Sequence, residues 1–150
     1  MLSNNVVIAI FKKITTMNRF KTLFLIALSI NILATIPLGL VLISPEMMEE
    51  MVFSQFVGIN DPGKEALELI HFVFLMIALS MIAALIVSLR IKVKESAQTA
   101  ALILGIIHLG WVLPDIINLV SGNQHPPIPI MILTIIPVLV LFHAWKKAEI

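Results

Sequence analysis

The chain of 150 residues has no cysteine and no tyrosine, and only 13% of its residues are charged. Without cysteine there is no disulfide, thiolate zinc site, iron–sulfur cluster or thiol redox chemistry, and without tyrosine there is no tyrosyl acid. Soluble domains are typically about 25% charged and about 45–50% apolar. This chain is 59% hydrophobic, with a mean hydropathy of +1.06. A soluble protein of this size could not bury so much apolar surface, so we expect an integral membrane protein.

Sequence signals of common enzyme chemistry are also missing. The chain has no glycine-rich phosphate loop, no His-Glu-x-x-His motif and no nucleophile elbow. The basic residues flank apolar segments and are not interleaved with aromatic residues, so we expect no nucleic acid partner. The methionines have no metal-ligand spacing. Two histidines could ligate haem iron, but His71 and His108 differ by about four residues in depth, which disfavours a site between them. No metal site is therefore predicted.

Four segments are long and apolar enough to cross a bilayer, which takes about 20 apolar residues. They cover approximately residues 22–43, 66–89, 97–120 and 128–145. The sequence therefore predicts an all-α integral membrane protein, an antiparallel four-helix transmembrane bundle in one domain.

The loop between the first two spans is long, polar and acidic. Residues 45–53 are expected to form a short amphipathic interfacial helix, with Pro45 in its first turn. Residues 60–63, Asn-Asp-Pro-Gly, predict a turn before the second span. Residues 121–127 cannot continue the third helix, because they contain glycine followed by two prolines.

The basic residues fall on one side of this four-span arrangement. Lys64 is the only one of the ten on the opposite side, in the acidic first loop. The positive-inside rule therefore predicts cytoplasmic termini, and we expect the bacterial cytoplasmic membrane. The other nine are Lys12, Lys13, Arg19, Lys21, Arg90, Lys92, Lys94, Lys146 and Lys147.

The first residues of the chain allow two interpretations. Residues 6–11 are apolar but too short to span, and they could form an interfacial helix. Alternatively, translation starts at Met17, which leads directly into the first span. We expect the first span to be uncleaved, because it is longer than a signal core and no small-x-small cleavage site follows it.

Four polar residues are expected in the outer leaflet. Glu68 and His71 lie about two and about five residues inside the outer end of the second span. Asp115 and Asn118 lie about five and about two residues from the outer end of the third. If these two spans pack as a hairpin, the side chains of His71 and Asp115 could meet.

A second polar layer is expected near the middle of the membrane. Asn31 and His108 lie about nine and about eleven residues from the cytoplasmic side, so we predict an interhelical hydrogen bond between them. His108 and Trp111 share one helical stripe with the two polar residues at the outer end of the third span. Pro114 lies in this stripe and frees the carbonyl group of Gly110, which predicts a kink or a local acceptor.

These residues suggest a ligand site. The polar side chains could orient a polar headgroup such as a quinone carbonyl, while an indole stacks on its ring. Equally, the polar pairs could serve only to hold helices together. The candidate ligand-binding residues are Glu68, His71, His108, Trp111, Asp115 and Asn118.

Two segments resemble the DoxX-like group of small four-span bacterial membrane proteins, including its BphX-like branch. Residues 37–45, Pro-Leu-Gly-Leu-Val-Leu-Ile-Ser-Pro, resemble the group's Gly-then-Pro exit from the first helix. Residues 107–115, Ile-His-Leu-Gly-Trp-Val-Leu-Pro-Asp, resemble the His-x-x-Trp-x-x-x-Asp pattern of the BphX-like branch, from which Pro114 departs. The resemblance implies a four-span protein with a quinone-linked or redox accessory role, and it transfers no catalytic residues.

The leading hypothesis is a non-catalytic membrane protein that binds a small apolar or quinone-like molecule, or assists a membrane redox complex. The cofactor is left open between quinone and lipid. One alternative is an enzyme that uses His71 and Asp115 as an acid–base pair on a lipophilic substrate. Another is proton transport through His108 and Asp115. A third is a structural scaffold or homo-oligomer without a ligand.

Overall fold

The computed structural model describes residues 19–123 and 125–147, and within these ranges it contains helices and loops but no strand. The apolar residues 6–11 and Met17 lie outside the described residues. The elements are α2 (Arg19–Ile43), α3 (Pro45–Met51), η1 (Phe53–Gln55), α4 (Asp61–Ser88), α5 (Lys94–Val120) and α6 (Ile128–Lys147).

The four long helices α2, α4, α5 and α6 are each long and apolar enough to cross a membrane. Their most apolar windows have mean hydropathies of 2.0 to 2.7. The protein is thus an all-α integral membrane protein in contact with bilayer lipid, as the sequence predicts. Every expected span coincides with one of these helices.

The second span begins earlier than expected, because residues 60–63 start the helix and do not form a turn before it. Asn60 is the N-cap of α4, and its side-chain oxygen accepts a hydrogen bond of 3.0 Å from the backbone N–H of Gly63. Pro62 lies in the first turn, where its missing N–H has no consequence. The sequence features that suggested a turn therefore form a capped helix end.

The predicted short helix of the first loop is confirmed as α3. Ser44 caps it by accepting a hydrogen bond of 3.3 Å from the backbone N–H of Met47. Glu49 of α3 forms an ion pair of 2.9 Å with Lys64 of α4, whose ammonium also lies 5.0 Å from the centre of the Phe53 ring. These contacts hold the first loop against the start of α4.

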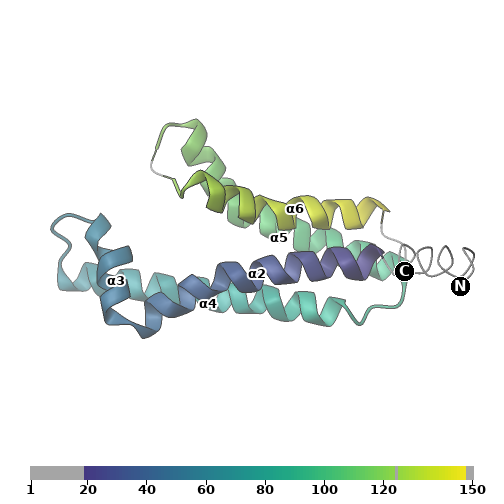
Figure 1. Ribbon diagram of the computed structural model, residues 1–150, viewed down its shortest axis with the longest axis horizontal. Coiled ribbons are helices and arrows are strands. Elements are labelled where there is room, and N and C mark those ends of the chain that lie inside the picture. The colour runs from purple at the N-terminus through teal and green to yellow at the C-terminus, as the bar shows by residue number, and fades with distance from the viewer. Residues whose placement is uncertain (1–18, 124, 148–150) are drawn as a thin grey trace, which may run out of the picture.

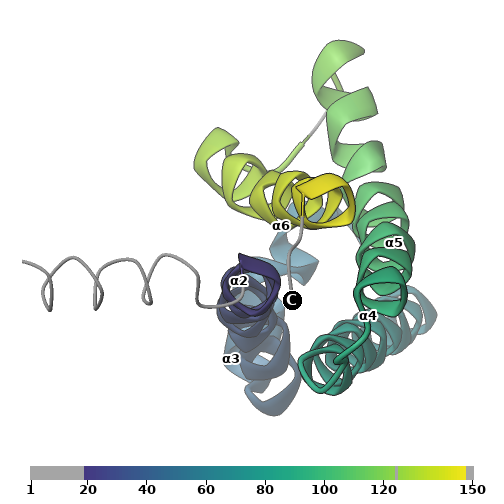
Figure 2. The same cartoon turned by 90° about the vertical axis from the view of Figure 1, so that its right-hand side faces the viewer.

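The four long helices form an open ring (Figure 2). Helix α2 packs along both α4 and α6, and α6 packs along α5. Helices α4 and α5 make few contacts, although the loop that joins them is the shortest connection between any two of the four long helices. The hairpin of spans two and three considered from the sequence is therefore not packed along its length.

Helix α5 packs mainly against α6, and two features accompany this arrangement. At the end that carries Arg19 and Lys147, the main core contains small residues of α5, such as Ala97 and Ala101, which let the helices approach closely. At the other end, the last turns of α5 bend away from the rest of the bundle (Figures 1 and 2). Pro114, where the sequence predicts a kink, lies inside α5.

The close approach of α5 and α6 at Gly105 can be tested by substitution. A Cβ atom at this position would lie 3.6 Å from the Cβ of Leu141 and from the Phe142 ring, which leaves no room for a larger side chain. We expect Gly105→Leu to lower the free energy of unfolding in mixed detergent micelles by about 1–3 kcal/mol. Gly110→Leu is the control, because nothing lies within 4 Å of its added Cβ. Equal destabilisation by both changes would contradict this packing.

Candidate functional site

The predicted hydrogen bond between Asn31 and His108 is present in the interior of the bundle. The side-chain nitrogen Nδ2 of Asn31 lies 2.9 Å from Nε2 of His108. Both residues are buried, with 7% and 4% of their surface exposed. The bond joins α2 to α5, two helices that lie across the ring from each other (Figure 2).

The surrounding carbonyl groups determine how this pair is protonated. Nδ1 of His108 lies 2.7 Å from the carbonyl oxygen of Leu104, so Nδ1 carries the hydrogen and donates it. Nε2 of the neutral ring then accepts from Nδ2 of Asn31. The second hydrogen of Nδ2 goes to the carbonyl oxygen of Ala27, 2.8 Å away. All donors of the pair are therefore used.

One acceptor of the pair is left over. Oδ1 of Asn31 lies 3.1 Å from Nε2 of His108, but two acceptors cannot bond to each other. Within the described ranges, no other hydrogen-bond partner approaches Oδ1. A buried amide oxygen normally has a donor, so this position calls for a water molecule or a ligand hydroxyl group.

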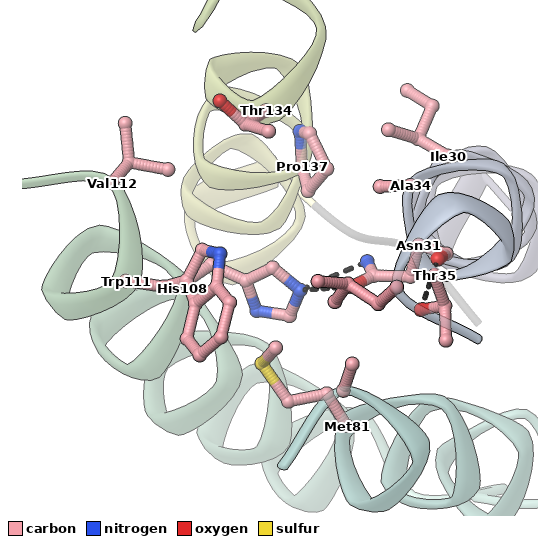
Figure 3. Close-up of a pocket in the computed structure, with 12 residues that line it drawn as sticks. Ile30, Asn31, Ala34, Thr35, Met81, His108, Trp111, Val112, Thr134 and Pro137 are labelled. Carbon is pink, nitrogen blue, oxygen red and sulfur yellow. Dashed lines mark hydrogen bonds between the residues drawn. The ribbon is translucent and has the colours of Figure 1, made fainter. Parts of the chain in front are cut away.

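A small pocket lies beside this pair, and we call it the Asn31–His108 pocket (Figure 3). Its volume is about 50 Å³ and its wall is mainly apolar. In Figure 3 the side chains of Asn31 and His108 point toward one another, with Trp111 beside the imidazole ring. The other lining residues are Ile30, Ala34, Thr35 and Leu38 of α2, Ala78 and Met81 of α4, Val112 of α5, and Thr134 and Pro137 of α6.

On the α4 side the pocket is lined by Ala78 and Met81, and Trp111 of α5 also lines it. Phe74 of α4 packs edge-on against the Trp111 ring with a centroid distance of 5.3 Å, which is one of the few contacts between α4 and α5. Met81 also lines a larger apolar groove of about 370 Å³ between these helices. A methionine side chain is flexible, so a rotation of Met81 would connect the pocket with the groove.

The structure brings only two of the six candidate ligand-binding residues, His108 and Trp111, into the pocket. Nδ1 of His71 lies 2.9 Å from the carbonyl oxygen of Leu67, one turn earlier in the same helix. His71 and Asp115 share no hydrogen bond or ion pair within the described parts of the chain. The contact between His71 and Asp115 that was expected from their equal depth in the membrane is therefore absent from the described residues.

The remaining candidates lie near the loops. Asp115 lies in the turn of α5 that follows Pro114, five residues before the end of the helix at Val120. Asn118 lies in the last turn of α5. Glu68 is exposed and lines a separate hollow beside Met48 of α3. None of these three lines the Asn31–His108 pocket.

Some pocket residues could not be inferred from the sequence. Thr35 had a signal, since it follows Asn31 by one helical turn, and its hydroxyl donates to the Asn31 carbonyl oxygen at 2.7 Å. No sequence signal pointed to Thr134 and Pro137, because neither the depth count nor the charge pattern says which face of α6 points inward.

Metal chemistry finds no support in the described ranges, where no group of three or more histidine or acidic side chains could hold a metal ion. The chain matches no protein-family model, no curated protein and no solved structure. The pocket geometry therefore carries the functional argument.

A double-mutant cycle tests the pairing of Asn31 with His108. We expect Asn31→Leu and His108→Leu each to lower the free energy of unfolding by about 1–3 kcal/mol, because each leaves its buried partner unpaired. The double variant should recover part of the loss, with a coupling of about 0.6 to 1.7 kcal/mol. The matched cycle of His71→Leu and Asp115→Leu should be additive within about 0.5 kcal/mol. Strong coupling in that cycle would contradict the separation of these two residues.

Proposed function

We propose that this protein binds a small apolar molecule with a hydroxyl group, such as a quinol, in the Asn31–His108 pocket. The observation that carries the proposal is the leftover acceptor Oδ1 of Asn31, which lies beside an apolar cavity. Binding sites for small molecules are commonly apolar with a few placed polar groups. The proposed role is binding, without catalysis by the protein.

The volume of the pocket sets how such a molecule would fit. A water molecule occupies about 30 Å³ in the liquid, and a cavity of about 150 Å³ holds benzene. The present pocket of about 50 Å³ therefore fits a hydroxyl group or water but no aromatic ring. The apolar body of the ligand would displace Met81 and lie along Trp111, at the near end of the groove between α4 and α5.

The hydrogen-bond pattern favours a reduced, hydroxyl-bearing ligand over a quinone. A quinol hydroxyl can donate to Oδ1 of Asn31. A quinone carbonyl is an acceptor and would face another acceptor, because both hydrogens of the Asn31 amide are already used. The pocket would therefore distinguish the two redox states of such a ligand.

The wider setting of the proposal rests on sequence patterns. The resemblance of residues 107–115 to the BphX-like branch of the DoxX-like group supports a redox accessory role, with a membrane redox complex as partner. The basic residues at one end of the bundle support cytoplasmic termini in a bacterial cytoplasmic membrane. The acid–base alternative, by contrast, requires a contact between His71 and Asp115. Within the described ranges no hydrogen bond or ion pair joins these two residues, so the alternative lacks support.

The test is the affinity of the purified protein for a methylated hydroquinone and for the corresponding quinone, measured anaerobically by calorimetry in detergent. We expect the hydroquinone to bind about threefold to tenfold more tightly, the effect of one hydrogen bond. Asn31→Leu should abolish this preference, and Trp111→Leu should weaken both ligands by removing the ring contact.

Asn118→Leu is the matched control, because it also replaces an asparagine of a spanning helix but lies outside the pocket. It should leave both affinities unchanged. Equal binding of the two redox forms, or equal effects of Asn31→Leu and Asn118→Leu, would contradict the proposal. Native mass spectrometry of protein extracted gently from its own membranes would identify the natural ligand.

A further inference from the structure

The open side of the helix ring forms an apolar groove, which we call the α4–α5 groove. It exists because α4 and α5 are joined by a short loop but barely touch, and it has a volume of about 370 Å³. Apart from the hydroxyl group of Ser80, its side chains are apolar, and that hydroxyl is already bonded to the carbonyl oxygen of Met76 at 2.8 Å. The groove therefore offers no polar group to an occupant and fits a hydrocarbon chain.

The groove has the length of one layer of lipid tails. Its lining residues on α4 run from Val73 to Ala84, about 16 Å along the helix axis at about 1.5 Å per residue. The hydrocarbon core of a bilayer is about 30 Å thick, so one leaflet contributes about 15 Å. Ser80 lies about 15 Å from Arg90 along α4, so an acyl chain whose headgroup is at Arg90 reaches the part of the groove from Ala84 to Ser80 within one leaflet.

Positive charge is concentrated at one end of the same two helices. Arg90, Lys92 and Lys94 lie in or beside the loop that joins α4 to α5, and all three are exposed. Glu95 is the only acidic residue next to them, so this stretch carries a net positive charge. Arginine and lysine bind phosphate through charge-assisted hydrogen bonds. Ala84 lies within two helical turns of Arg90.

We propose that the α4–α5 groove binds one anionic glycerophospholipid. The phosphate and the charged headgroup interact with Arg90, Lys92 and Lys94, and one acyl chain lies in the groove against Ile77, Ser80 and Leu104. The combination of an apolar groove with a basic loop at its end distinguishes this site from the rest of the lipid-facing surface. Met81 is the one residue that lines both this groove and the Asn31–His108 pocket, so the lipid site borders the proposed ligand site.

Native mass spectrometry with defined lipids tests this proposal. The protein is delipidated in detergent and mixed with equal amounts of phosphatidylglycerol and phosphatidylcholine of the same acyl chains. We expect one phosphatidylglycerol to be retained in preference. The triple variant Arg90→Gln, Lys92→Gln, Lys94→Gln should lose this preference, by about fivefold for each basic residue removed at low ionic strength.

Two matched controls separate local from general effects. The variant Lys21→Gln, Lys146→Gln, Lys147→Gln removes the same charge from the same end of the bundle, but from α2 and α6, and should keep the preference. Ser80→Phe fills the groove and should reduce retention of both lipids. Leu79→Phe changes an exposed neighbour on α4 outside the groove and should not.

Three results would overturn the proposal. Equal retention of the two lipids by the unchanged protein would remove the role of the basic loop. Equal effects of the two charge variants would show general attraction to that end of the bundle. A dimer that Ser80→Phe disrupts would show that a second copy of the chain occupies the groove. Loss of hydroquinone binding without loss of the lipid would refute only the proposed ligand pocket.

Discussion

The hydrogen bond between Asn31 and His108 is the constraint on which the interior of the bundle depends. It places two polar side chains where apolar packing would otherwise fill the space, and it joins α2 to α5 across the ring. Lipid offers no hydrogen bonds, so polar groups within the membrane find their partners inside the protein. Here the Leu104 and Ala27 carbonyl groups complete the set of acceptors. The one atom left over, Oδ1 of Asn31, lies beside the cavity.

The sequence placed Asn31 and His108 at one depth, and their side chains meet because α2 and α5 also turn these residues toward each other. The flanking charges fix the ends of each span, and a count of residues from those ends gives depth at about 1.5 Å per residue. The same count placed His71 and Asp115 at one level, but they do not meet. Depth does not say which helices are neighbours or how each is rotated, and α4 and α5, which carry His71 and Asp115, barely touch.

Local sequence signals predicted which helices form more accurately than they predicted where each helix begins and ends. Apolar length predicted all four spanning helices, because no other structure satisfies the backbone in lipid without closing a barrel. The start of α4 was misjudged because Asn, Asp, Pro and Gly serve both turns and helix N-termini. The contribution of α6 to the pocket, through Thr134 and Pro137, depends on helix rotation, which composition does not encode in an apolar helix whose two sides differ little.

The open ring links the two proposed sites through one side chain. Helices α4 and α5 diverge because α5 packs on α6 through small residues, and the bundle is left without a fourth packed interface. An acyl chain in the groove would supply that interface and would hold Met81 in its inward position, where the ligand pocket stays small. A ligand that displaces Met81 would in turn occupy the near end of the groove. Binding at the two sites would then be mutually weakening, and by thermodynamic linkage each ligand would lower the affinity for the other by the same factor.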